Sequence, residues 1–491
     1  MNYKSTRGSQ NLKTGAQAVI QGIAEDKGLY VPVEMPAFPF EAKDLTGKSY
    51  QEIALKVLGC FFDDYTEEEL KKCVYGAYDE KFEAEEIVPV KEAGGAYFLE
   101  LYHGKTAAFK DMALSILPYL MTTALKKEGV TDKVCILTAT SGDTGKAALE
   151  GFADVEGTEI IVFYPYGAVS QVQERQMTSQ EGKNTHVFAI KGNFDDAQTG
   201  VKKIFNDDEY GAALKAQGIR LSSANSINIG RLTPQVAYYV YGYVKLLEAG
   251  VVKEGEPVNI VVPTGNFGNI LAAYIAKEAG IPVKKFICAS NENKVLTDFI
   301  NTGVYDIRRQ FMVTNSPSMD ILISSNLERL LYLLCGGDGA QVKDWMTQLE
   351  TNKAYEVSDE VKAGLKAFYG GYCGEAETIE TIGKMYKEEN YLMDTHTAVA
   401  YKVYKDYVAE TDDETPALIA STASPYKFAE SVAEGLGMEK SENGFECVRT
   451  LEAETGVKVQ KGLKDLDKKP VIHTGVCEVS EMPDVIIDAL K

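Results

Sequence analysis

The sequence has few of the residues on which several kinds of site depend. Only 4 of its 491 residues are histidines, and they are scattered at positions 103, 186, 396 and 473. Its 8 cysteines include no Cys-x-x-Cys pair, and no histidine stands at metal-ligand spacing. These absences argue against a metal site and against a Ser-His-Asp triad. Ordinary buried thiols in a reducing compartment explain the cysteines best, which predicts a cytoplasmic protein.

Basic residues are outnumbered: 51 Lys and Arg against 72 Asp and Glu give a formal charge of −21. A nucleic acid would be repelled, and no Lys/Arg-rich stripe offers a local exception. The longest uncharged apolar run, residues 112–125, is shorter than the roughly 20 residues of a membrane-spanning helix, and Pro118 interrupts it. We therefore expect no nucleic-acid partner and no membrane partner. A monomer and a homodimer both remain open.

Short β-branched runs alternate with amphipathic helices through most of the chain. The predicted strands are residues 134–138, 159–164, 186–190, 259–263, 285–289 and 417–421. Such alternation predicts an α/β fold with a mostly parallel sheet and helices on both faces. Ligands of these sheets bind beyond the carboxyl ends of the strands, so the loops that leave those ends are the places to search.

Residues 263–269 (PTGNFGN) form the first of three such loops. Glycines let successive N–H groups point into one concavity, and the start of the following helix adds partial positive charge. This loop predicts a phosphate-binding site. Taken alone, an ordinary strand-to-helix turn with an Asn cap explains it about as well.

The second loop, residues 138–146 (TATSGDTGK), superficially resembles a nucleotide P-loop. That pattern requires a glycine where Thr140 stands and a Ser or Thr where Ala147 stands, so this loop is not a nucleotide P-loop. Hydroxyls and free N–H groups at a helix start suit a carboxylate instead.

The third loop places Lys110 at the entrance to the apolar helix expected at residues 112–125. Lysine is seldom buried unless paired, although a lysine reaching out to solvent is the simpler interpretation. Only about 0.04% of an exposed lysine is neutral at pH 7, so a nucleophilic lysine needs apolar surroundings, which Phe109 and residues 114–117 could supply. A phosphate-binding loop and such a lysine together indicate pyridoxal phosphate.

Five motifs resemble those of the threonine synthase family. They are HGKTAAFKD at residues 103–111, SGDTG at 141–145, NSINIGR at 225–231, GNFGN at 265–269 and TASPYKF at 422–428. The start YKSTR, residues 3–7, is similar to that of the longer bacterial and fungal subgroup. The resemblance implies a fold-type II pyridoxal-phosphate enzyme with open, mostly parallel sheets in a large and a smaller lobe and an N-terminal helical cap. Its activity would be that of a lyase in threonine biosynthesis, converting O-phospho-L-homoserine and water into L-threonine and phosphate.

The resemblance also implies roles for individual residues. Lys110 would hold the cofactor as a Schiff base and act as catalytic base, and Thr422 would face the pyridine nitrogen with a neutral hydroxyl. The cofactor phosphate would be bound by Gly265, Asn266, Phe267, Gly268 and Asn269. Because the protein is itself negatively charged, local donors must bind the anionic substrate, and we assign these donors separately from the resemblance. They are Ser141, Gly142 and Thr144 for the carboxylate, with Asp143 as a provisional member, and Arg231, assisted by Lys105, for the phosphate. Asp143 could instead cap the following helix, and Arg231 could instead form a surface ion pair.

Two positions depart from the family pattern. Lys105 stands where many members have Pro, and Ser424 stands where many have His. The first leaves the rigidity of that loop in doubt, and the second removes a proton-carrying or phosphate-contacting group. His396 is more simply a helix-capping or core histidine, and the tyrosines at 238, 239, 241 and 243 fit core packing or a subunit contact better than catalysis.

The motifs divide the chain into three parts. We predict an N-terminal cap at residues 1–90, an α/β core at 91–436 whose smaller inner lobe covers about 131–231, and a C-terminal segment at 437–491. Fold and cofactor do not fix the reaction, so a serine/threonine dehydratase and a β-replacing synthase are alternatives. A non-enzymatic protein that binds a phosphorylated metabolite is a third.

Overall fold

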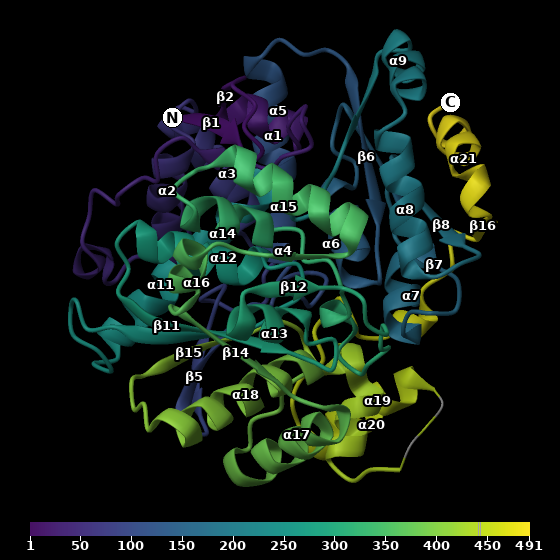
Figure 1. Cartoon of the computed structure of the whole chain (residues 1–491). Helices are drawn as coiled ribbons and strands as arrows, with labels where there is room; N and C mark the ends of the chain where they lie inside the picture. Colours follow the sequence, from purple (N-terminus) through teal and green to yellow (C-terminus); the bar gives the residue numbers. More distant parts are fainter. Residues whose placement is uncertain (440, 442) are drawn as a thin grey trace.

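Two β-sheets organise the chain in the computed structural model, which describes residues 1–439, 441 and 443–491 (Figure 1). Residues 440 and 442, within the predicted C-terminal segment, lie outside the described residues. The larger sheet has the strand order β14-β11-β10-β15-β5-β4, and the smaller has the order β16-β8-β7-β6-β9. In both sheets every described pairing is parallel except that of β4 with β5. The α/β prediction is therefore confirmed.

The larger sheet forms the centre of the molecule. Its strands are β4 (Val90–Ala93), β5 (Ala96–Glu100), β10 (Val258–Pro263), β11 (Val283–Ser290), β14 (Phe368–Tyr372) and β15 (Ala417–Ser421). Every residue of β10 and β15 is buried, because α11 (Pro234–Glu248) and α12 (Gly268–Glu278) cover one face and α18 (Thr395–Thr411) covers the other. Gly242 lets α11 lie directly on β15, since a Cβ there would be 2.6 Å from the side chain of Leu418.

The smaller sheet lies beside the larger one and combines strands from residues 133–222 with a strand from near the C-terminus. Its strands are β6 (Lys133–Ala139), β7 (Thr158–Pro165), β8 (Thr185–Ile190), β9 (Ile219–Ser222) and β16 (Gly475–Cys477). The helices around it are α6 (Asp143–Phe152), α7 (Gln171–Thr178), α8 (Phe194–Phe205), α9 (Asp208–Ala216) and α21 (Met482–Ala489). Figure 1 shows β16 and α21 returning to the edge of this sheet, where β16 pairs with β8.

The N-terminal region joins a small antiparallel sheet to three helices. Its elements are β1 (Asn2–Ser5), β2 (Lys13–Thr14), β3 (Tyr30–Pro32), α1 (Gly15–Gln21), α2 (Tyr50–Phe61) and α3 (Glu67–Ala77). Thr66 and Glu69 form a capping box at the start of α3, with hydrogen bonds of 3.2 and 2.8 Å. α2 packs against α11 and so joins this region to the large sheet.

The apolar run expected as one helix at residues 112–125 is two helices, and that prediction was wrong in detail. α4 (Asp111–Leu114) ends before α5 (Leu117–Lys127) begins. Pro118 lies in the first turn of α5, where its missing N–H leaves no helical hydrogen bond unmade.

The other helices and the last strand pair complete the layers. They are α10 (Ile229–Leu232), α13 (Val295–Thr302), α14 (Leu327–Leu334), α15 (Gly339–Asn352), α16 (Asp359–Leu365), α17 (Glu375–Glu389), α19 (Ala429–Gly435), α20 (Gly444–Thr455), β12 (Val304–Asp306) and β13 (Ala354–Glu356). Among the described residues, none of the helices combines the length and apolar character that crossing a membrane requires.

Candidate active site

A cavity of about 1200 Å³ opens where the carboxyl ends of β6, β10 and β15 meet. Ten of the residues singled out from the sequence line it: Lys110, Ser141, Thr144, Arg231, Gly265, Asn266, Phe267, Gly268, Asn269 and Thr422. Three others, Lys105, Gly142 and Asp143, are not among its lining residues. The strand ends thus gather segments that are up to about 300 residues apart, as the parallel-sheet rule requires.

Lys110 lies directly before α4, with its amine inside the protein. Its Nζ is 3.3 Å from Ser318 Oγ and 3.5 Å from the nearer Asp143 oxygen, and it lies 5.1 Å from the centre of the Phe109 ring. Burial lowers the pKa of Lys110, and the positive charges of Lys427 and Arg231 act in the same direction, against the carboxylate of Asp143. A neutral amine is therefore easier to form here than on an exposed lysine.

The loop after β10 turns sharply into α12. Phe267 has a left-handed backbone conformation (φ 64°), and α12 begins at the next residue, Gly268. Gly265 has no room for a side chain, because a Cβ would lie 2.6 Å from the Ser318 carbonyl oxygen. Ser324 Oγ donates to the Gly265 carbonyl oxygen at 2.7 Å and so fixes the turn. The loop and the first turn of α12, where a helix leaves its N–H groups without helical acceptors, line the cavity.

Asn269, in the first turn of α12, has one half of its amide held and the other half free. Its Oδ1 is 2.9 Å from the Tyr238 hydroxyl and also accepts a hydrogen bond from the Tyr239 hydroxyl. Its Nδ2 is buried and has no hydrogen-bond partner among the described residues. A buried amide that donates to nothing costs free energy, so a bound ligand with a hydrogen-bond acceptor near Asn269 Nδ2 would stabilise the site. Two members of the tyrosine run therefore orient a cavity residue as well as fill the core.

The loop after β6 has already used part of its hydrogen-bonding capacity. Thr140 Oγ1 accepts from the N–H groups of Gly142 and Gly145, at 3.0 and 2.9 Å. Gly142 has φ 135°, and a Cβ on it would lie 2.6 Å from the side chain of Gln173. Gly142 is thus required by geometry, whereas Ser141 and Thr144 face the cavity.

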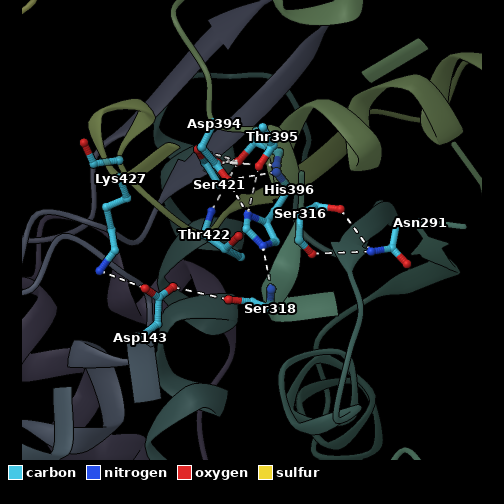
Figure 2. A network of polar contacts seen from close by, with 12 residues as sticks. Asp143, Asn291, Ser316, Ser318, Asp394, Thr395, His396, Ser421, Thr422 and Lys427 are labelled. Atoms are coloured by element: carbon cyan, nitrogen blue, oxygen red, sulfur yellow. Dashed lines mark hydrogen bonds and ion pairs between the residues drawn. The ribbon is translucent and has the colours of Figure 1, made fainter. Parts of the chain in front are cut away.

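Asp143 does not cap α6, so that alternative was wrong; Gly142 is the cap residue. Asp143 Oδ1 is 2.9 Å from Lys427 Nζ, and Oδ2 accepts from Ser318 Oγ at 3.3 Å (Figure 2). Asp143 Oδ1 also accepts from Gln173 Nε2 at 2.9 Å. Burial would raise the pKa of Asp143, but the ammonium groups of Lys427 and Lys110 outweigh it and keep the pKa well below the usual range.

Arg231, on the short helix α10, is buried with incomplete hydrogen bonding. Only 3% of it is exposed, and its Nη1 donates to the Ala224 carbonyl oxygen at 2.7 Å. Its Nε is buried without a hydrogen-bond partner, and no carboxylate among the described residues forms an ion pair with it. Burial lowers the pKa of Arg231 to about 10. The surface ion pair considered as an alternative is therefore wrong.

Thr422 follows β15 and is joined to the lysine segment. Its carbonyl oxygen accepts from the Phe109 N–H at 2.8 Å, and the neighbouring residues Ala108 and Ala423 form a β-bridge. These contacts hold Lys110 beside the end of β15. Thr422 itself is 5% exposed and lines the cavity.

The two positions that depart from the family pattern lie away from the cavity. Lys105 is half exposed and its Nζ pairs with Glu150 at 2.9 Å, so the structure does not bring it to the substrate side. Ser424 is buried, donates to Gln460 Oε1 at 2.6 Å and accepts from the Tyr426 N–H at 3.2 Å. Both side chains are satisfied by neighbours that do not line the cavity.

Three residues of the site were missed or set aside in the sequence: His396 and Ser318, which line the cavity, and Lys427, which is buried behind it against Asp143. His396 lines the cavity; its Nδ1 is 2.8 Å from Asp394 Oδ1, and its Nε2 accepts from the Ser318 N–H at 3.1 Å (Figure 2). This bonding fixes the neutral ring with the proton on Nδ1. Asp394 caps α18, so the capping interpretation of His396 was wrong, whereas the core interpretation fits its 3% exposure. The contact of His396 with Ser318, 78 residues away, was not predicted.

The groups around the cavity fit pyridoxal phosphate. The buried amine of Lys110 is a nucleophile for its aldehyde. The unpartnered amide of Asn269, at the start of the 11-residue helix α12, can donate to its phosphate, and the hydroxyl of Thr422 can meet its ring nitrogen. Among the described residues, no group of three or more His, Cys, Asp or Glu side chains is arranged to hold a metal ion.

Family models match most of the chain. The model "Threonine synthase N terminus" matches residues 2–78, "Pyridoxal-phosphate dependent enzyme" matches residues 86–422, and "Threonine synthase, C-terminal" matches residues 397–470. Together they extend over the larger sheet, over the smaller sheet except β16, and over all the cavity segments described above.

Curated relatives fall into two groups. The chain is 41% identical to threonine synthase-like 1 of Homo sapiens over 438 residues, which is 87% of this chain and 58% of that protein. The chain thus spans little more than half the length of these relatives. It is 35% identical to threonine synthase of Saccharomyces cerevisiae over 466 residues, 88% of this chain and 89% of that protein.

Solved structures agree with both findings. The PLP-bound threonine synthase from Brucella melitensis superposes with a TM-score of 0.87 at 35% identity, covering 100% of this chain and 99% of that one. Threonine synthase from yeast superposes with a TM-score of 0.87 at 32% identity, covering 100% and 98%. The fold-type II architecture and the cofactor expected from the sequence are confirmed. The chain belongs to the threonine synthase family of pyridoxal-phosphate-dependent enzymes.

Proposed function

We propose that this chain is a lyase that converts O-phospho-L-homoserine and water into L-threonine and phosphate, with the cofactor on Lys110. The family relationship supports this reaction. The feature that carries it is Arg231, a buried guanidinium beside Lys110 with an unpartnered Nε and no carboxylate partner among the described residues. A desolvated, uncompensated cation of this kind suits a phosphate on the substrate, which serine and threonine lack.

Each remaining role belongs to a group at the cavity wall. Bound pyridoxal phosphate would supply an electron-accepting ring conjugated to the substrate's α-carbon. Lys110 Nζ, whose pKa burial lowers, would take the proton from that carbon and return it. Ser141 and Thr144 would bind the substrate carboxylate at the start of α6, and residues 265–269 would bind the cofactor phosphate. Gly142, whose N–H donates to Thr140 Oγ1, would shape the turn instead. Thr422 would meet the ring nitrogen with an uncharged hydroxyl, which tempers the electron sink compared with an Asp.

The Tyr239 hydroxyl yields a testable consequence of this arrangement. Replacing Tyr239 with Phe removes a hydrogen bond that orients the Asn269 amide, so we expect cofactor affinity to fall about fivefold, for about 1 kcal/mol. Tyr243→Phe is the matched control, because that hydroxyl lies on the same helix but donates to the Glu256 carbonyl oxygen. Titration of the unloaded proteins with pyridoxal phosphate measures both. Equal affinities for the two variants would contradict the role given to Asn269.

Product analysis tests the reaction directly. Incubation of the loaded protein with O-phospho-L-homoserine should release threonine and inorganic phosphate in equal amounts. Incubation with serine or threonine should release little ammonia or keto acid. The reverse pattern would favour a dehydratase and overturn the proposal.

We extend the proposal to the setting of the enzyme. Its eight cysteines are all free, which fits a reducing compartment such as the cytoplasm. O-Phospho-L-homoserine is the proposed small-molecule partner, and the chain would act as a monomer or a homodimer.

A further inference from the structure

Lys427 is a completely buried lysine whose ammonium group is fully bonded. It is 0% exposed and lies in the 3₁₀ turn Pro425–Phe428, shortly after Thr422. Its Nζ is 2.9 Å from Asp143 Oδ1, donates to the Thr106 carbonyl oxygen at 2.9 Å and donates to Gln176 Oε1 at 3.0 Å. Three acceptors match the three protons of an ammonium group, so each N–H of Lys427 has a partner.

The carboxylate of Asp143 contacts two lysines at unequal distances, and Figure 2 shows the closer contact, with Lys427. Oδ1 takes Lys427 and Gln173, each at 2.9 Å, whereas Oδ2 lies 3.5 Å from Lys110. The closer ion pair is thus the one with Lys427. Lys110 has only long contacts, the other being Ser318 Oγ at 3.3 Å.

Besides burial, the charges of Asp143 and Lys427 affect how strongly Lys110 retains its proton. A lone buried carboxylate at 3.5 Å would stabilise the ammonium form of Lys110 and remove it from chemistry. A second ammonium on the far side of that carboxylate acts in the opposite direction, because like charges disfavour each other. The pKa of Lys110 is lowered first by burial, and Lys427 contributes to the lowering.

We propose that Lys427 is a positioning residue: its fixed ammonium occupies Asp143 and so leaves Lys110 free to exchange its proton. The inference rests on the proposed role of Lys110 as the cofactor lysine. Lys427 also connects the end of β15 to α6 and α7, because its partners Asp143 and Gln176 lie on those helices. The Lys427 side chain therefore holds the Asp143 carboxylate in position and favours its ionised form.

Other charged groups near this cluster remain in place when Lys427 is replaced. Arg231 on α10 lowers the pKa of Lys110, and Asp111 on α4 is buried with a pKa raised to about 6. Asp111 is bonded by Thr106, at 2.8 Å through the N–H and 2.6 Å through the hydroxyl. Lys146 and Glu150 pair with each other on α6 at 3.0 Å, and His396 touches Ser318. None of these groups replaces Lys427 at Asp143 Oδ1.

The test is the pH at which the Lys110 nitrogen loses its proton. In the full-length chain loaded with pyridoxal phosphate, the visible absorption of the Lys110-linked cofactor reports this midpoint. We expect Lys427→Met to raise the midpoint by about one pH unit or more, tenfold in proton affinity, because Asp143 then acts on Lys110 alone. Asp143→Asn should lower it. The double variant should return towards the unchanged protein, since the two opposite charges leave together.

Controls separate this charge effect from a structural one. Lys427→Arg keeps the charge and should keep the midpoint, and Lys146→Met removes a cation whose carboxylate partner is Glu150 and should change it little. A second readout needs neither cofactor nor turnover: the pH dependence of acetylation of Lys110 in the unloaded chain, measured by mass spectrometry against the exposed Lys491. The pH midpoint of Lys110 acetylation should rise in Lys427→Met and fall in Asp143→Asn, as the absorption midpoint does. If Lys427→Met does not fold, the opposite shift of Asp143→Asn still decides the sign.

The proposal is overturned if Lys427→Met leaves the midpoint unchanged or lowers it, or if Asp143→Asn raises it. It is also overturned if the double variant shifts as far as Lys427→Met alone. These outcomes are independent of the products formed, so they remain distinguishable from a failure of the proposed reaction.

Discussion

Replacing Lys110 with alanine is expected to reduce threonine formation by about a thousandfold or more. Among the residues that the structure describes, Lys110 is the one cavity-lining lysine next to the end of β15, and its buried amine has a lowered pKa. Its loss removes both the covalent attachment of the cofactor and the proposed base. Borohydride reduction followed by peptide mass spectrometry should find the cofactor on the peptide of residues 106–126 in the unchanged protein only.

Lys105→Ala is the matched control. It removes a lysine five positions earlier whose side chain is half exposed and paired with Glu150. An exposed ion pair contributes little, so we expect activity close to that of the unchanged protein. Comparable losses in the two variants, or a cofactor that stays covalently attached in Lys110→Ala, would contradict the assignment.

Replacing Arg231 with alanine should lower kcat/KM for O-phospho-L-homoserine by about a hundredfold, or about 2.7 kcal/mol. The expected cause is the loss of the buried cation that, in the proposed reaction, would bind the substrate phosphate. Arg231 also lowers the pKa of Lys110, so each protein must be compared at its own optimal pH. Inhibition by inorganic phosphate should weaken in parallel, because product and substrate would share this contact.

Arg220→Met controls for charge alone. Arg220 also lines the cavity, but its Nη2 pairs with Asp132 at 3.2 Å and its side chain is 38% exposed. We expect substrate use and phosphate inhibition to change little in this variant. An Arg231→Ala protein with unchanged apparent affinity for the substrate and for phosphate would show that the phosphate binds elsewhere.

The buried strands were predictable because their chemistry is local. β6, β7, β8, β10, β11 and β15 are short, apolar runs between turn residues, and a strand covered on both faces reads this way. β14 was missed because its sequence, FYGGY, contains two glycines. The structure explains them: a Cβ on Gly370 would meet the backbone of Thr297 at 3.0 Å, and one on Gly371 would meet Val403 at 2.5 Å. Close packing of helices on both sides therefore hides this strand.

The residues of the site, too, fall into those that the sequence predicted and those that it did not. Lys110 and the loops at 141–145 and 265–269 are contiguous motifs at strand ends, and they were found. Ser318, His396 and Lys427 were not, because each acts through a contact with a residue far along the chain, such as Asp143. Lys105 was placed near the substrate on sequence proximity alone, yet Thr106 turns inward with 0% exposure while Lys105 turns out to Glu150.

Turnover in heavy-oxygen water tests the proposed reaction most directly. The reaction breaks the bond between the substrate's γ-carbon and its phosphate oxygen and adds water at the β-carbon. The account therefore predicts heavy oxygen in the hydroxyl of the threonine formed and none in the released phosphate. Heavy oxygen in the phosphate, with homoserine as the other product, would mean simple hydrolysis of the phosphate ester and would contradict the account.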